Sequence, residues 1–134
     1  MNYQVGWGNI PEPWNENDVL VWIGRSSRYM CQQEGDTFHK SEFLLNEEIK
    51  TARAYDYEDQ KHEALYNDDH HYGRLVSHCL EWFIQNQLLI EERIPDKGGS
   101  EYSMYRKTPA LVRLCPKILR YELPDMRSFV QRQR

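Results

Sequence analysis

The stretch that decides the fold runs from Asp69 to Thr108 and reads DHHYGRLVSHCLEWFIQNQLLIEERIPDKGGSEYSMYRKT. In its first part, apolar residues recur at the i, i+3, i+4, i+7, i+8 and i+11 spacing that places side chains on one face of an α-helix. These residues are Tyr72, Leu75, Val76, Cys79, Leu80 and Phe83. Asn67 or Asp68 is a suitable N-cap, so we expect an amphipathic helix that ends at Asn86 and Gln87.

A β-hairpin is expected directly after this helix. Residues 88–94 and 102–107 alternate apolar and polar side chains with the period of two that is typical of strands. Between them lies Pro-Asp-Lys-Gly-Gly-Ser at positions 95–100. This composition is typical of a turn, because glycine adopts positive φ without steric cost. The amphipathic helix therefore leads straight into two paired strands.

A first helix is expected near the N-terminus. Asn15 or Asn17 can cap it, and a rough apolar stripe continues to Met30. The unbroken apolar run Val19–Ile23 leaves a strand possible for the first half of this segment.

A short extended stretch and a second helix are expected next. Glu34, Gly35 and Asp36 interrupt regular structure, and Thr37 and Phe38 after them are predicted to be extended. Ser41 is a good N-cap for a helix that ends near Arg53. Residues 54–69 are acidic and rich in tyrosine, with weak periodicity. We expect them to form an inserted linker with at most a short helix.

The C-terminal part predicts a further helix. Thr108 is an N-cap and Pro109 occupies the first helical position, where proline loses no useful hydrogen bond. An apolar stripe follows, made of Leu111, Leu114, Cys115 and Ile118. Pro116 interrupts it, so a kink or two short helices are expected. Residues 123–134 are short and basic, and are predicted to be either frayed or docked on a partner.

The order helix, short strand, helix, amphipathic helix and hairpin resembles that of the winged helix superfamily. The step Gln87-Leu88-Leu89-Ile90 is similar to the point where the recognition helix enters the wing in that superfamily, with Gln87 where a glycine is usual. The second strand leads to Thr108, two residues later than in the tightest examples. The resemblance implies an α+β, mainly helical fold. We expect one domain over 1–134, with a winged helix core at 17–108 and a C-terminal helical extension or tail at 109–134.

The resemblance implies that the chain binds double-stranded DNA through the amphipathic helix and the hairpin. An α-helix fits the major groove, and an arginine can contact guanine through two hydrogen bonds, so Arg74 is the candidate for base contacts. The other candidates on the outward face of the helix are His70, His71, His78 and Gln85. In the hairpin, the candidates for phosphate or minor-groove contacts are Lys97, Arg106 and Lys107.

Charge is divided unevenly along the chain, although the formal net charge is −4. Residues 1–72 contain 6 basic and 14 acidic residues, whereas residues 73–134 contain 11 basic and 7 acidic ones. A basic face is therefore possible despite the negative total. The function expected first is that of a small transcriptional regulator or a DNA-transaction factor of a mobile element, acting as a homodimer. Two non-enzymatic alternatives stay open: a protein–protein interaction module, and an acidic nucleic-acid mimic that uses residues 54–69 to contact a protein.

Enzymatic chemistry, cofactors and metal ions are not expected. The sequence lacks a nucleophile elbow, a phosphate loop and a dinucleotide fingerprint. His70 and His78 are two helical turns apart, too far to share one ion on that helix. The three cysteines are scattered and odd in number, so they are predicted to be free thiols of a cytoplasmic protein. No apolar run is long enough for a membrane helix.

Overall fold

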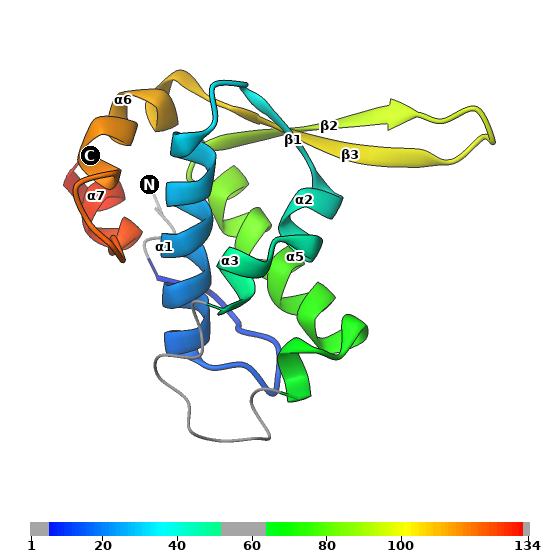
Figure 1. Cartoon of the computed structure of the whole chain (residues 1–134), viewed down its shortest axis with the longest axis horizontal. Helices are drawn as coiled ribbons and strands as arrows, with labels where there is room; N and C mark the ends of the chain where they lie inside the picture. Colours follow the sequence, from blue (N-terminus) through cyan, green and yellow to red (C-terminus); the bar gives the residue numbers. More distant parts are fainter. Residues whose placement is uncertain (1–5, 52–63, 133–134) are drawn as a thin grey trace.

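The computed structural model of the chain describes residues 6–51 and 64–132. The predicted α+β class is confirmed, because a group of helices is joined to a small antiparallel sheet that extends from one side of them (Figure 1). In chain order the elements are α1 (Glu16–Gln32), β1 (Thr37–His39), α2 (Lys40–Leu45), α3 (Glu47–Thr51), α5 (Asp69–Gln85), β2 (Leu89–Pro95), β3 (Glu101–Lys107), α6 (Pro109–Ile118) and α7 (Met126–Arg132). One cluster of buried side chains extends from Trp7 to Val130 and joins α6 and α7 to the rest.

Helix α1 begins with a capping box formed by Asn15 and Asp18. The Asn15 side chain accepts a hydrogen bond from the Asp18 N–H at 3.0 Å, and the Asp18 carboxylate accepts one from the Asn15 N–H at 2.9 Å. The strand alternative for Val19–Ile23 is wrong, since this run is helical. The run is nearly solid in apolar residues because α1 lies centrally and contacts α3 and α5 as well as α6 and α7 (Figure 1).

The single helix predicted to begin at Ser41 is wrong. His39 is the N-cap of α2, and its Nδ1 accepts a hydrogen bond from the Ser41 N–H at 3.0 Å. The chain then leaves the helix at Asn46, whose side-chain oxygen accepts from the Ile49 N–H at 3.1 Å and starts α3. The asparagine thus caps a new helix, as this residue commonly does. The break leaves Leu45, the last residue of α2, 73% exposed.

The acidic segment predicted as a linker is described only at its end. Residues 52–63, which include most of its acidic side chains and the predicted helix end near Arg53, lie outside the described residues. A short helical turn covers 64–66, and Tyr66 is buried there. Its hydroxyl donates a hydrogen bond to Asp18 at 3.2 Å, so this end of the segment belongs to the core.

The amphipathic helix and the hairpin are confirmed. All six apolar residues predicted for one face of α5 are buried, and Asp68 caps the helix by accepting from the His71 N–H at 3.0 Å. The sheet order is β1-β3-β2, with β3 paired antiparallel to both neighbours. Figure 1 shows the β2–β3 hairpin projecting from the helices. Between α5 and β2, Gln87 has φ 62°, in the left-handed region that favours glycine.

Helix α6 begins as predicted, with Thr108 as N-cap and Pro109 next to it. Of the two alternatives at Pro116, the two short helices are wrong, because α6 continues through this residue to Ile118. Pro116 falls in the last turn, where its missing N–H removes a single bond near the helix end. The frayed alternative for residues 123–134 is wrong for the part that the structure describes, because α7 buries Met126, Phe129 and Val130.

The prediction that the cysteines are free thiols is wrong for two of the three. Cys31, at the end of α1, and Cys115, in α6, form a disulfide across 84 residues of sequence. Cys79 is a free thiol inside the core, and burial raises its pKa well above the ordinary value. Sequence spacing did not suggest the pair, because only the packing of α6 on α1 brings the two residues together. A cytoplasmic location stays a prediction.

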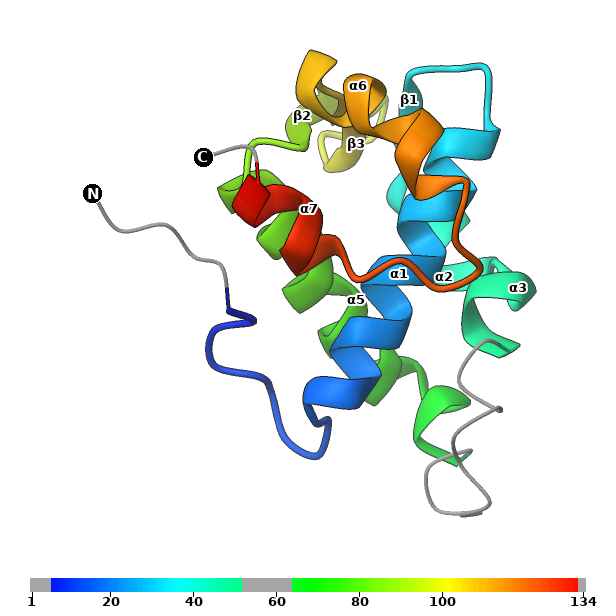
Figure 2. The ribbon, with the colours of Figure 1, turned by 90° about the vertical axis from the view of Figure 1, so that its left-hand side faces the viewer.

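Gly24 lets the chain between α6 and α7 cross α1 closely (Figure 2). A Cβ atom at this position would lie 2.8 Å from Leu123 Cδ1 and 2.8 Å from the Pro124 carbonyl oxygen. Real carbon contacts of this kind are not that short, so an added methyl group would displace the crossing backbone.

We therefore expect Gly24→Ala to lower the free energy of unfolding by about 1–3 kcal/mol, despite the higher helix propensity of alanine. Gly73→Ala is the matched control, because Gly73 is also helical and a Cβ there meets nothing within 4 Å. The control should be neutral or stabilising by up to about 1 kcal/mol. Urea denaturation measures the free energy of unfolding of both variants. Equal stability of the two would contradict the close approach of Leu123 and Pro124 to Gly24.

Candidate nucleic-acid interface

The N-terminal residues 6–14 cover part of the face of α5 that was expected to be free (Figure 2). The Trp14 indole N–H donates to the His71 carbonyl at 2.8 Å, and Arg74 Nη1 donates to the Glu12 carbonyl at 3.1 Å. His78 Nε2 donates to the Trp7 carbonyl at 2.7 Å and is half-buried. Two candidate side chains on α5 are therefore bound within the chain.

Two tryptophans explain why the segment lies there. Trp7 contacts Trp82 of α5 with 5.1 Å between ring centroids, and both rings are buried. The Arg127 guanidinium of α7 lies 4.7 Å from the centroid of the Trp7 ring, a cation–π contact. The apolar pattern of α5 did not include Trp82, because this residue is buried by the N-terminal segment and not by the side of α5 that faces α1.

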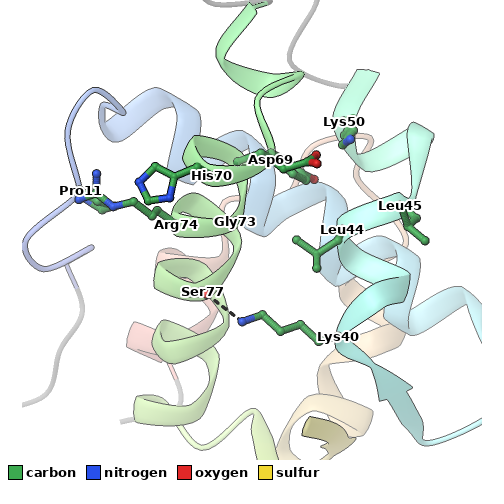
Figure 3. A pocket seen from close by; sticks show the side chains of 11 residues that line it. Pro11, Lys40, Leu44, Leu45, Lys50, Asp69, His70, Gly73, Arg74 and Ser77 are labelled. Carbon is green, nitrogen blue, oxygen red and sulfur yellow. Dashed lines mark hydrogen bonds between the residues drawn. The ribbon is translucent and has the colours of Figure 1, made fainter. Parts of the chain in front are cut away.

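An open hollow lies between the N-terminal half of α5 and helices α2 and α3 (Figure 3). Its volume is about 750 Å³. The lining residues are Pro11, Lys40, Leu44, Leu45, Lys50, Asp69, His70, Tyr72, Gly73, Arg74 and Ser77. The predicted candidates His70 and Arg74 are thus brought together on one wall, while Gln85 is exposed at the far end of the helix.

Three cations of the hollow are held in place without a carboxylate partner. Lys40 Nζ donates to Ser77 Oγ at 2.9 Å, and Lys50 Nζ lies 4.8 Å from the centroid of the Tyr72 ring. Arg74 is held by its bond to the N-terminal segment. Among the described residues, no carboxylate forms an ion pair with any of these three. The hollow is therefore a site of unbalanced positive charge on a chain of net charge −4.

The candidate cations of the hairpin differ from those of the hollow. Arg106 Nε is 2.9 Å from the Glu92 carboxylate on the neighbouring strand, and this ion pair lowers the pKa of Glu92. Arg93 is paired with Glu101 in the same way at 3.9 Å. Lys97 is exposed at the tip of the hairpin. Of the predicted hairpin residues, Lys97 is therefore the one whose charge stays available.

Lys107 is buried and its ammonium group binds the C-terminal end of α1, so it is unavailable to a nucleic acid in this conformation. Its Nζ donates to the carbonyls of Met30 and Gln33, at 3.0 Å each, and lies 5.6 Å from the centroid of the Phe38 ring. The last turn of α1 contains no basic residue of its own. The lysine of β3 supplies the positive charge that stabilises the negative end of the helix dipole.

We expect Lys107→Met to lower the free energy of unfolding by about 1.5–3 kcal/mol, since hydrogen bonds from a charged donor are lost while the apolar stem is kept. Arg106→Met, which removes an exposed ion pair on the same strand, should cost less than about 1 kcal/mol. Guanidinium denaturation compares the two variants. A larger loss for Arg106→Met than for Lys107→Met would contradict the capping role.

Sequence reasoning missed Lys40 and Lys50 as site residues. Neither lies in the stretch that suggested the fold, and the break at Asn46 places Lys50 on a separate helix, α3. Their place on the hollow follows from how α2 and α3 lie beside α5, which local sequence patterns do not contain.

Comparison with known protein families, characterised proteins and solved structures gives no match to this chain. Within residues 6–51 and 64–132, no three metal-ligating side chains are grouped closely enough to bind an ion. None of the helices described is both long and apolar enough to span a bilayer. The case for a function therefore depends on the geometry of α5, the hollow and the hairpin.

Proposed function

We propose that the chain is a winged helix protein that binds double-stranded DNA through the N-terminal half of α5 and the cations of the hollow. Three features support this. The amphipathic helix leads directly into a hairpin that forms a three-stranded sheet of order β1-β3-β2, as in a wing. Gln87, where the superfamily commonly has glycine, adopts a positive φ. Helix α2 supplies a lysine beside α5, because Lys40 Nζ donates to Ser77 Oγ.

The division of roles follows from the chemistry of each side chain. Lys40 and Lys50 are compact positive charges suited to phosphate oxygens, and Lys97 reaches the backbone from the hairpin tip. Arg74 is exposed, and its planar guanidinium suits the O6 and N7 atoms of guanine. His70, on the same wall, adds a weaker polar contact.

The observation that carries the proposal is the set of three cations around one hollow, none of them ion-paired within residues 6–51 and 64–132, against one carboxylate in the lining, Asp69. A duplex carries dense negative charge, and neutralising it releases counterions, which favours binding to such a surface. Phosphate contacts by the paired arginines of the hairpin would contribute less binding free energy, because each arginine would first have to leave its ion pair. As a homodimer, two copies would present α5 to major grooves one helical turn apart, so we propose that state for the DNA-bound form.

Salt dependence of duplex binding tests the proposal. With three phosphate contacts, raising the salt from about 50 to about 200 mM should weaken binding roughly 40-fold by fluorescence anisotropy. Lys40→Ala/Lys50→Ala should reduce that loss to roughly 3-fold, since only Lys97 remains. Arg113→Ala, which removes an exposed cation on α6, is the control and should leave binding unchanged.

Base contact is tested by Arg74→Ala on a selected duplex and on a scrambled one. We expect a loss of about 1–3 kcal/mol on the selected site and little change on the scrambled site. No binding to a mixed pool of genomic duplex at the lower salt concentration would overturn the proposed function.

A second function is favoured by the N-terminal segment. Its contacts to His71, Arg74 and His78 restrict access to α5, and the hairpin exposes Ile90 and Tyr102 while its arginines are paired. We propose as the alternative a non-enzymatic module that contacts another protein through the hairpin. In that case Ile90→Ser should abolish partner binding, whereas Lys40→Ala/Lys50→Ala should not.

A further inference from the structure

We propose that the hollow between α2, α3 and α5 is a binding site for a small amphiphilic anion, a carboxylate or phosphate group attached to a short aliphatic part. This inference goes beyond DNA binding and does not depend on it. It rests on the coincidence of fixed cations with one partly buried and one exposed leucine, Leu44 and Leu45, in the lining of one hollow (Figure 3).

The cations lie at separate points of the lining, and Figure 3 shows Lys40 and Lys50 on the α2–α3 side and Arg74 on the side of Pro11. Lys40, Lys50 and Arg74 come from three helices and line the same hollow. Each is held by a neighbouring group that leaves its charge unneutralised: a serine hydroxyl, a tyrosine ring and a main-chain carbonyl. Side chains that are already positioned lose less conformational entropy when a ligand binds.

The apolar part of the lining has no use in phosphate binding. Leu44 and Leu45 of α2 lie between the two lysines, and Figure 3 shows Leu44 directed into the hollow. Leu45, at 73%, is the most exposed large hydrophobic residue in the described part of the chain. Covering these side chains with an aliphatic group would remove apolar surface from water, which is favourable at roughly 25 cal/mol per Å².

The size of the hollow favours a small molecule. Its volume of about 750 Å³ falls within the range of roughly 300–1,000 Å³ that is typical of small-molecule sites. Asp69 is the acidic residue of the lining, and it would repel a second negative group. We therefore expect one charged head and one apolar tail, with the head at one of the two lysines and the tail against Leu44.

Octanoate is the probe that tests the site, in ¹H–¹⁵N correlation spectra of the full chain. Saturable shifts should centre on the amides of Leu44, Leu45, Gly73 and Ser77. Acetate, which has the head but not the tail, should bind at least about 10-fold more weakly. Octyltrimethylammonium, which has the tail and the opposite charge, should produce no shifts at these amides.

Variants separate the two parts of the site. Lys40→Ala/Lys50→Ala should weaken octanoate binding roughly 10-fold, and Leu45→Ser should weaken it while leaving acetate unaffected. Arg113→Ala and Val112→Ser, exposed on α6, are the matched controls and should change nothing. The variants must show wild-type spectra away from the hollow, so that loss of fold is not mistaken for loss of the site.

Three results would overturn the inference: shifts centred outside the hollow, equal binding of the cationic probe, or equal binding of acetate. Co-sedimentation with vesicles of anionic phospholipid that depends on Leu45 would also overturn it, because the ligand would then be a membrane surface. Duplex binding is measured separately. If both proposals hold, octanoate should displace the duplex, whereas failure of duplex binding alone would leave the ligand site standing.

Discussion

Replacing Cys31 by serine should lower the free energy of unfolding by about 2–4 kcal/mol, one of the two largest effects expected for this chain. The bond to Cys115 closes a loop that spans 84 residues, more than half of the 134-residue chain. Closing so long a loop restricts the unfolded ensemble strongly, and the loop-entropy relation gives an upper value of about 4.5 kcal/mol. The bond also holds α6 against the end of α1, beside the carbonyls that Lys107 caps.

Reversible denaturation with and without reductant measures this effect. The oxidised chain should lose stability when dithiothreitol is added and then match Cys31→Ser. The double variant Cys31→Ser/Cys115→Ser should be insensitive to reductant. Titration of thiols in denaturant should find one per oxidised chain, since Cys79 is the remaining cysteine of the three. Three reactive thiols in protein isolated without reductant would contradict the disulfide.

Replacing Trp22 by alanine should lower the free energy of unfolding by about 3–5 kcal/mol, which is the usual range for a buried tryptophan. Trp22 is 1% exposed and lies 5.9 Å from Phe43, centroid to centroid. Its indole N–H donates to the Tyr72 hydroxyl at 2.9 Å, and that hydroxyl donates to the Phe43 carbonyl at 3.3 Å. These contacts connect α1, α5 and α2 at the base of the hollow.

Trp22→Phe is the control that separates packing from hydrogen bonding. It keeps an aromatic ring in the core, so it should cost less than the alanine variant, with a loss of about 1–3 kcal/mol for the missing indole hydrogen bond to Tyr72 and the smaller ring. Thermal unfolding followed by circular dichroism measures both variants. Since domains of this size are stable by only about 5–15 kcal/mol, Trp22→Ala should shift the midpoint by tens of degrees or prevent folding at 37 °C. Equal stability of the two variants would show that the ring does not fill the core.

Local patterns predicted the elements whose burial is one-sided. Helix α5 has one apolar face on the core, so its spacing identified both the helix and its buried residues. The hairpin and Thr108 were recognised from alternation, turn residues and capping preference. Helix α1 gave an ambiguous pattern, because it is covered on two sides and its apolar residues form a nearly solid run.

The candidate site was predicted only in part, for reasons that involve distant segments. Arg74 and His70 were found from the helix face, and they do lie together on the hollow. Sequence position could not show that Lys107 caps the C-terminal end of α1. Nor could it show that Glu92 pairs with Arg106 or that Trp7 contacts Trp82. The availability of a charge depends on its neighbours in space, which a linear pattern does not contain.

By itself, therefore, the sequence determined the α+β class, the succession of elements from α5 to the start of α6, and the residues that α5 buries, because these follow from local periodicity and capping. The tertiary structure decided which cations are available, where Lys40 and Lys50 meet Arg74, and that Cys31 and Cys115 are joined. The physical reason is that ion pairs, disulfides and concave surfaces form between residues far apart in the chain. Their existence depends on how the helices pack, which no short stretch of sequence specifies.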